Sequence, residues 1–401
     1  MERAIYEEYV KILKEELVMA MGCTEPIAVA YAAALASRAL GSKPESIEVL
    51  VSKNIIKNVK SVVVPCTGGL RGIKAAVCAG IVAAKPEKEL EILADVTESQ
   101  KEEMKEMMEN IPITVKESDS GYVFDIQIRT LAGGHTGYVQ ISGYHTNVIR
   151  LMRDGEVLSE KDYTEQQPIQ STNHDLLNVE NIIEFADCVD IKDVEEVLER
   201  QISCNKAIAK EGMTGKWGAA IGCTLMEAYG DSVHNRAKAM AAAGSDARMN
   251  GCELPVVINS GSGNQGMTAS LPVIVYAEEL KVSREMMLRA LVVSNLITIH
   301  LKTGIGRLSA YCGAISAGCG AGAGICYLYG GRKMEISHVI VNAVAINSGV
   351  ICDGAKASCA AKIASAVEAG LLGLQMQKRG KEFSFPIWAL RPTTGRRRIP
   401  P

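Results

Sequence analysis

A stretch rich in glycine, alanine and cysteine, from residue 311 to residue 359, constrains the fold of this chain more than any other. It contains few aromatic residues and five of the twelve cysteines. These are Cys312, Cys319, Cys326, Cys352 and Cys359. Small side chains let helices pack closely, and cysteines in such a setting can lie near each other and near a bound inorganic group. Our hypothesis is that three of them hold an iron–sulfur cluster.

Spacing alone does not select the three ligands. Cys312, Cys319 and Cys326 are seven residues apart, which places neighbours on one face of a helix but ~10 Å apart along its axis. That separation is too large for one cluster, so Cys319 and Cys326 fit equally well as buried structural cysteines. No CxxC pair is present, which excludes the zinc-ribbon and ferredoxin patterns.

The other two cysteines of the stretch are also seven residues apart, but a turn is expected between them. Asp353 can cap a helix that begins at residues 354–355. Cys352 would then lie in the preceding loop, which could fold back towards Cys359. Buried structural packing remains the alternative for either residue.

Length and charge limit the class of protein. With 401 residues and 47% hydrophobic residues, the chain can form two or three domains with large cores. A net charge of −3 gives no basic surface for nucleic acid. The longest apolar run, residues 27–36, is too short for a membrane span of about 20 residues, and the N-terminus lacks a secretory signal. We expect a cytoplasmic protein with reduced thiols, no nucleic-acid partner and no membrane partner.

The pattern along the chain predicts an α+β protein with a mostly helical catalytic domain and a smaller α+β domain. Residues 1–41 are expected to form two helices that pack on the catalytic domain. Residues 42–165 alternate as strands with two helices between them, which favours a mostly antiparallel sheet. A polar linker leads into the helical, cluster-binding domain at 166–378. The tail 379–401 is interpreted as disordered, and its sequence as vector-derived or frameshifted. The alternative is a basic arm that binds nucleic acid.

A candidate reactive thiol lies near the N-terminus, in the sequence GCTEP. Thr24 is suited to cap a helix, Glu25 to its first turn and Pro26 to its start. Cys23 would then lie just before a helix N-terminus, which favours negative charge and lowers the pKa of a thiol. The alternative is a buried cysteine beside the cap.

The sequence INSGSGNQG at 258–266 is a candidate binding loop. Gly261, Gly263 and Gly266 would let backbone N–H groups turn inwards as a nest for an anion. The predicted substrate-binding residues are Ser260, Gly261, Ser262, Gly263, Asn264 and Gln265. Without a Walker lysine the loop favours a carboxylate over a nucleotide, and an ordinary Ser/Gly turn is the alternative. His145 and Asn147, in the sequence HTN, could reach the same site from the domain boundary.

Taken in order, these segments resemble those of a known family. The matching segments are GCTEP (22–26), PCTGG (65–69), HTN (145–147), SGSGNQG (260–266), YCG (311–313) and ICDGAKASC (351–359). Over residues 1–378 the chain resembles the L-cysteine desulfidases, which are related to the UPF0597 group, and is more distantly similar to the iron–sulfur L-serine dehydratases.

The resemblance implies a [4Fe–4S] cluster held by Cys312, Cys352 and Cys359, with one iron open to bind the sulfur of the substrate. It implies a lyase that converts L-cysteine into pyruvate, ammonia and hydrogen sulfide without pyridoxal phosphate, with Cys23 as base or as a displaceable fourth ligand. A small amino acid is thus the expected partner. A homo-oligomer would suit the Ala/Gly-rich helices. The alternatives are an L-serine dehydratase-type lyase and a sensor that binds a cluster or metabolite without turnover.

Overall fold

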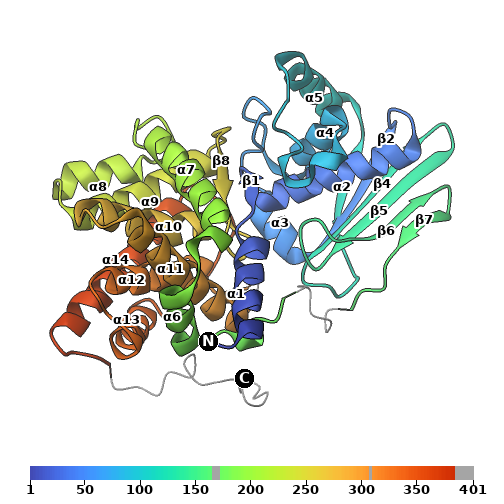
Figure 1. Cartoon of the computed structure of the whole chain (residues 1–401). Helices are drawn as coiled ribbons and strands as arrows, with labels where there is room; N and C mark the ends of the chain where they lie inside the picture. Colours follow the sequence, from blue (N-terminus) through green and yellow to red (C-terminus); the bar gives the residue numbers. More distant parts are fainter. Residues whose placement is uncertain (165–171, 307–308, 384–401) are drawn as a thin grey trace.

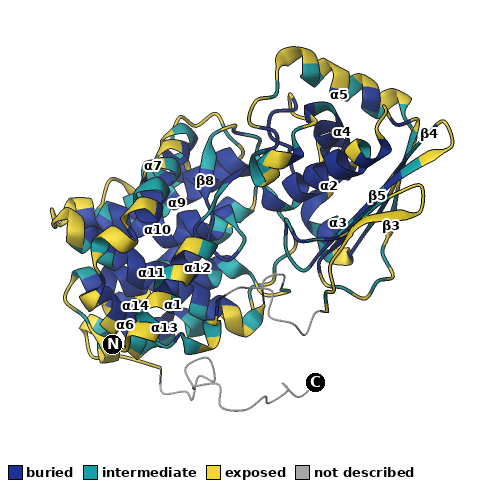
Figure 2. Ribbon diagram, turned by 45° about the vertical axis from the view of Figure 1, so that its right-hand side comes forward, coloured by how far each residue is buried: buried dark blue, intermediate teal, exposed yellow. Residues whose placement is uncertain are grey.

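The computed structural model describes residues 1–164, 172–306 and 309–383, and its elements form two halves (Figure 1). One half is built around a six-stranded sheet and the other is almost entirely helical, as an α+β class requires. Each half has a buried interior of its own (Figure 2). None of the described helices is long and apolar enough to cross a bilayer. The predicted tail lies outside the described residues from 384 onward.

The sheet has the strand order β3–β2–β4–β5–β6–β7. Its strands are β2 (Ser46–Val51), β3 (Ile113–Glu117), β4 (Asp125–Ala132), β5 (His135–Ser142), β6 (Val148–Arg153) and β7 (Glu156–Glu160). Only the β2–β3 pair is parallel, so the prediction of a mostly antiparallel sheet is confirmed. Buried and exposed residues alternate along β2 and β4, which gives the sheet one apolar face.

Helices cover that apolar face and the junction. This half contains α2 (Thr24–Leu40), α3 (Lys53–Val59), α4 (Gly72–Ala83), the 3₁₀ turn η1 (Pro86–Glu91) and α5 (Glu98–Asn110). α2 lies across the sheet in contact with β4, β5 and β6, and α4 packs on α2. α5 lies outermost, against α4 (Figure 1).

The other half is a bundle that encloses the Gly/Ala-rich stretch. Its helices are α1 (Arg3–Glu16), α6 (Val179–Cys188), α7 (Glu195–Gly212), α8 (Ile221–Tyr229), α9 (Val233–Met249), α10 (Gly263–Glu279), α11 (Arg284–Ile305), α12 (Gly313–Leu328), α13 (Lys333–Ile346) and α14 (Cys359–Lys378), with 3₁₀ turns η2 (His174–Leu176) and η3 (Ile191–Asp193). α12 lies between α10, α11, α13 and α14.

The two N-terminal helices do not share a core, which differs from the expected packing on the helical domain. Tyr9, Ile12 and Leu13 of α1 are fully buried in the core of the helical half. α2 instead supplies the centre of the core above the sheet. Because α2 is apolar on nearly every side, its sequence carries no preference for one core over the other. The apolar face of the sheet decides where it packs.

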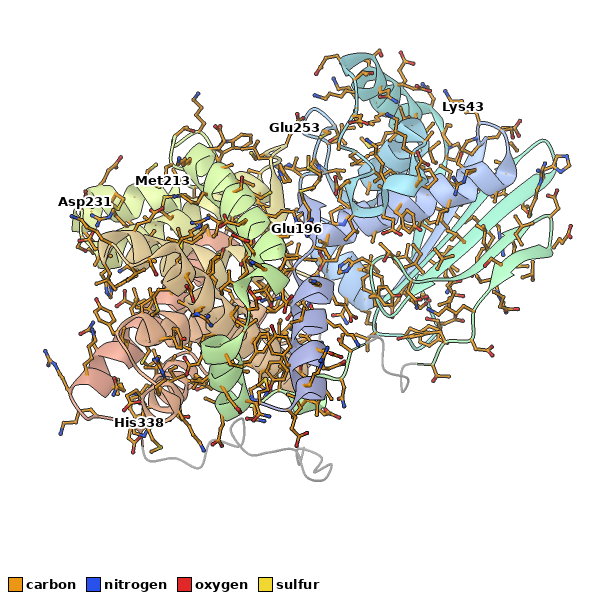
Figure 3. The ribbon with its side chains drawn as sticks, in the orientation of Figure 1. Lys43, Glu196, Met213, Asp231, Glu253 and His338 are labelled. Carbon is orange, nitrogen blue, oxygen red and sulfur yellow. The ribbon has the colours of Figure 1, made fainter. Side chains whose placement is uncertain are left out.

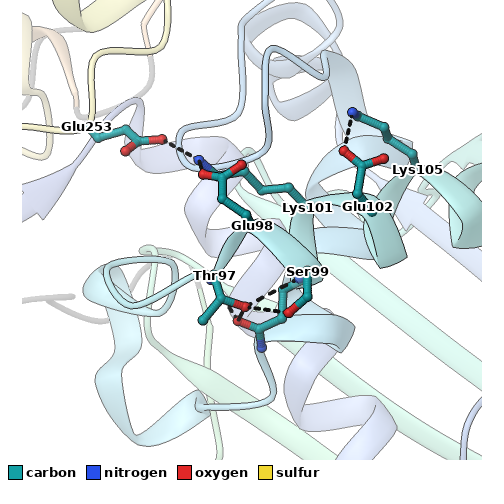
Figure 4. Close-up of polar contacts among 8 residues, drawn as sticks. Thr97, Glu98, Ser99, Lys101, Glu102, Lys105 and Glu253 are labelled. Atoms are coloured by element: carbon teal, nitrogen blue, oxygen red, sulfur yellow. Dashed lines mark hydrogen bonds and ion pairs between the residues drawn. The ribbon is translucent and has the colours of Figure 1, made fainter.

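Short contacts join the two halves beside α2. β1 (Met19–Met21) pairs antiparallel with β8 (Pro255–Val257), so the chain crosses from one half to the other between α1 and α2. Lys101, on α5, lies 3.4 Å from the carboxylate of Glu253 in the helical half (Figure 4). Figure 3 places the side chain of Glu253 at this junction, with Lys43 and Asp231 at the outer ends of the two halves.

Glycines permit the close crossing of α12 and α14. Gly318→Ala is expected to lower the free energy of unfolding by about 1–3 kcal/mol, because its methyl carbon would lie 2.2 Å from the carbonyl oxygen of Ala366. The matched control is Gly304→Ala, at an exposed position of α11 with no atom within 4 Å, where alanine is the better helix former. Thermal unfolding measures both, and equal melting temperatures would contradict the close packing.

Asp246 makes stability depend on pH in the helical half. It is fully buried near the end of α9. Burial raises the pKa of its carboxyl to about 6, against the opposing effect of N–H groups at the start of α8. The folded chain therefore holds this proton more tightly than the unfolded chain, and stability falls as pH rises from about 4 to about 6. We expect Asp246→Asn to abolish this part of the pH dependence, measured as melting temperatures at pH 5 and pH 7. An unchanged difference between the two pH values would contradict it.

Candidate functional site

A cavity of about 120 Å³ lies between the two halves. The helical half lines it with the binding loop, the start of α12 and the segment before α14. The sheet half lines it with Cys23, Glu25, residues 57–58, Phe124 and residues 143–145. The cavity thus collects most of the residues that the sequence singled out, from segments up to some 340 positions apart.

Four helices begin at this cavity. Cys23 is the N-cap residue of α2, Ser262 that of α10 and Cys312 that of α12, while Cys359 is the first residue of α14. The backbone N–H groups of a first helical turn lack partners within the helix and carry partial positive charge. Their convergence favours negatively charged groups in the cavity, such as thiolates and a carboxylate.

The predicted ligand trio is assembled by a short bridge between two loops. Tyr311 pairs antiparallel with Ile351. The N–H of Cys312 donates to Val350 at 3.0 Å and the N–H of Cys352 to Ala310 at 2.7 Å. Cys359 follows at the start of α14 and lines the same cavity. Burial raises the pKa of the Cys312 and Cys359 thiols, and the neighbouring Cys352 adds to each shift.

The residues around this trio fit an anionic iron–sulfur cluster. Within the described ranges no three Cys, His, Asp or Glu side chains are arranged to hold a single metal ion, but ligands of a cluster bind different irons and need not meet at one point. Four cationic side chains line the cavity, namely Lys57, Arg248, Lys302 and Lys362. The donor set therefore has the right chemistry and a compensating charge.

Cys319 and Cys326 lie elsewhere. Both are buried within α12, 1% and 2% exposed, and belong to the helical core. Burial raises the pKa of both thiols to about 12. Neither lines the cavity, and their burial agrees with the structural interpretation of the heptad-spaced pair.

The surroundings of Cys23 contradict the predicted lowering of its pKa. The thiol is 2% exposed and donates a hydrogen bond to Oε2 of Glu25 at 3.2 Å. Burial raises the pKa of this thiol well above its ordinary value, and the Glu25 carboxylate raises it further. Desolvation and a neighbouring negative charge outweigh the start of α2, so Cys23 keeps its proton in this environment.

Glu25 is a polar centre that sequence reasoning treated only as a first-turn residue. Its carboxylate also accepts from Asn58 Nδ2 at 2.9 Å. Burial on its own raises the pKa of Glu25, but His145, the Cys23 hydrogen bond and Arg248 bring it below its ordinary value. A buried, ionised carboxylate thus lies directly beside the candidate reactive thiol.

The binding loop is the turn that leads into α10. Ser260 and Gly261 have positive φ angles of 49° and 77°, whereas Gly263 and Gly266 are helical. Gly266 is required for packing, because a Cβ there would lie 2.0 Å from the carbonyl oxygen of Val257. Of the six predicted residues all but Gly263 line the cavity. The three glycines therefore do not form a nest, and the backbone N–H groups that an anion could reach are those at the start of the helix.

Arg248 joins this loop to the start of α2. Its guanidinium donates to the carbonyl oxygen of Gly22 at 2.8 Å and to Oδ1 of Asn264 at 3.1 Å, and the hydroxyl of Thr24 donates to the carbonyl oxygen of Gly261 at 3.0 Å. Sequence reasoning missed Arg248, although an arginine near the end of the Ala-rich α9 was an available signal. Nothing local marked Asn58 or Lys302.

The two predicted site residues of the HTN sequence, His145 and Asn147, have different surroundings. His145 is 8% exposed and lines the cavity. Asn147 does not line it: its amide donates to the carbonyl oxygen of Ser142 at 2.8 Å and accepts from Lys161 at 2.9 Å. Asn147 therefore shapes the loop that presents His145 and is not placed to touch a substrate, which corrects the prediction for this residue.

Comparison with known proteins agrees with the motifs. The family model for the serine dehydratase alpha chain matches residues 87–388. A UPF0597 protein of Desulfitobacterium hafniense is 57% identical over 378 residues, covering 94% of this chain and 88% of the relative. This chain belongs to the UPF0597 family, which is related to the serine dehydratases. A UPF0597 protein of Lachnoclostridium phytofermentans is 50% identical, covering 94% and 91%, and one of Treponema denticola is 42% identical, covering 96% and 90%.

The serine dehydratase family model covers most of the cavity lining, but not all of it. The matched residues 87–388 include the binding loop and the three candidate ligands. They exclude Cys23 and Glu25. The family supports lyase chemistry of the serine dehydratase type.

Proposed function

We propose that this protein is an iron–sulfur-dependent carbon–sulfur lyase that converts L-cysteine into pyruvate, ammonia and hydrogen sulfide without pyridoxal phosphate. One observation carries the proposal. Cys312, Cys352 and Cys359 line a single cavity together with a buried thiol–carboxylate pair and the start of α10. Ligands, a proton acceptor and a carboxylate site are the three parts that such a β-elimination needs.

Cys312, Cys352 and Cys359 would hold a [4Fe–4S] cluster. When bound, a cluster with only three protein ligands supplies a Lewis acid that stabilises the departing sulfide. Lys362 lies beside these thiols, where it interacts with Cys312 and Cys359, and compensates part of their negative charge.

The start of α10 would bind the carboxylate of the substrate. Ser262 makes no side-chain cap bond there, so its hydroxyl and the first N–H groups of the helix are available to an anion. Arg248 holds this loop against the start of α2 through Asn264 and Gly22. The carboxylate is thereby fixed relative to Cys23, which orients the bond from the α-carbon to its hydrogen.

Cys23 and Glu25 would move the α-proton. Because the thiol already donates to Oε2 of Glu25, its proton passes to that carboxylate as the sulfur takes the proton from the α-carbon. The electron pair left on the α-carbon forms the Cα–Cβ double bond and the Cβ–S bond breaks. The resulting aminoacrylate tautomerises and hydrolyses to pyruvate and ammonia.

The test is an anaerobic assay of pyruvate from L-cysteine and from L-serine with protein reconstituted with iron and sulfide. We expect cysteine to be the better substrate by kcat/KM, with hydrogen sulfide formed in equal amount to pyruvate. The family name favours a second candidate, L-serine dehydration, and faster turnover of serine would establish it instead. Bound iron and sulfide without pyruvate from either amino acid would point to a sensor.

A further inference from the structure

Two side-chain amide oxygens at the cavity have no hydrogen-bond partner among the described residues. They are Oδ1 of Asn58 and Oε1 of Gln265, and both side chains line the cavity. The residues are only 6% and 5% exposed. Because a buried polar atom without a partner is unfavourable, such atoms are rare in folded proteins and call for an explanation.

The orientation of the Asn58 amide is fixed by its neighbour. Its Nδ2 donates to Oε1 of Glu25 at 2.9 Å. If the amide were turned over, its oxygen would face that carboxylate, which is unfavourable. Oδ1 is therefore an acceptor left for an incoming donor.

Gln265 completes an acceptor site from the opposite half. Asn58 lies on α3 and Gln265 in the first turn of α10. The side chain of Gln265 is wedged against Gly313, where a Cβ would lie 2.6 Å from its Cδ. The fixed acceptor of Asn58, the amide oxygen of Gln265 and the negative charge of Glu25 favour a small cation with several N–H donors.

We propose that Asn58 Oδ1 and Gln265 Oε1 bind the α-ammonium group of a free amino acid. The start of α10 takes the carboxylate and the two amide oxygens take the ammonium, so the site selects a zwitterion over a plain carboxylic acid or an N-acylated amino acid. The proposal rests on the proposed function for the placement of the carboxylate, and it assigns Asn58 and Gln265 as the residues that recognise the free amino group of the substrate.

The test uses ligands that cannot react. Binding of L-alanine, propionate and N-acetyl-L-alanine to the anaerobic, reconstituted full-length protein is measured by calorimetry. We expect L-alanine to bind at least ~10-fold more tightly than the other two, about 1.4 kcal/mol. Asn58→Leu and Gln265→Met should each weaken the binding of L-alanine by ~10-fold and leave the affinity for propionate unchanged. The two substitutions lie in different halves of the molecule. If one variant fails to fold, the other variant still tests the proposal.

Asn54→Leu is the matched control, because Asn54 lies on the same helix, outside the cavity lining, and bonds to a carbonyl oxygen of Val123. It should bind L-alanine as the wild type does. Equal affinity of the wild type for L-alanine and propionate, no L-alanine binding by the folded protein, or full L-alanine affinity in both cavity variants would overturn the proposal. A preference for L-alanine without pyruvate from cysteine would refute the proposed reaction alone and leave the ammonium site standing.

Discussion

Cys352→Ala protein, reconstituted with iron and sulfide under anaerobic conditions, is expected to retain at least ~10-fold less iron and acid-labile sulfide than the wild type. Cys352 is one of the three candidate ligand thiols in the cavity lining, and it is held beside Cys312 by the bridge between Tyr311 and Ile351. Loss of one of three ligands leaves too few donors to keep a cluster. Iron and sulfide analysis with visible absorbance measures the effect independently of turnover.

Cys319→Ala is the matched control for this experiment. Cys319 comes from the same Gly/Ala-rich stretch but is buried within α12 and does not line the cavity. The control should bind iron and sulfide as the wild type does. If Cys319→Ala lost the cluster while Cys352→Ala kept it, the assignment of the ligand trio would be wrong.

Cys23→Ala is expected to lower kcat for pyruvate formation by ~10²–10⁴ with little change in bound iron. The thiol is the group that donates to Oε2 of Glu25 at 3.2 Å, so its removal interrupts the proposed path of the α-proton. A role as fourth cluster ligand predicts a different result, namely altered cluster absorbance or iron content. Kinetics and iron analysis on the same preparation therefore separate the two roles.

Cys78→Ala serves as control for that variant. Cys78 is fully buried on α4 in the same half of the molecule and lies outside the cavity lining. It should keep wild-type turnover, with only the modest loss of stability that a small buried deletion causes. Full activity of Cys23→Ala would contradict the proposed proton transfer.

Several of these features could be predicted from residue pattern. Alternating strands between residues 42 and 165 predicted the antiparallel sheet, because strand periodicity is a local property. The binding loop and Cys312, Cys352 and Cys359 were predicted to share a site, and the three cysteines and five of the six predicted loop residues line one cavity. The spacing of the cysteines did not select this trio, which came from the resemblance of several short motifs.

The environment of each site residue was not predictable in the same way. The sequence placed Cys23 correctly at a helix start, yet the direction of its pKa depends on burial and on the Glu25 carboxylate. Asn147 lies two residues from His145, but the turn at Ser142 directs its amide into the loop. Such properties depend on which groups face one another across the junction, and no local pattern records that.

The sequence by itself determined the element types, the small-residue helices and the candidate residues, because propensity, periodicity and turn chemistry act over a few neighbouring positions. Tertiary structure alone decided that α2 joins the sheet, that four helix starts converge, and that Asn58 and Gln265 face one cavity from opposite halves. α2 is apolar on nearly every side, so burial favours either core equally, and only the shape of the apolar sheet face selects one. Once α2 lies there, Cys23, Glu25 and the cysteine trio are brought to the same cavity.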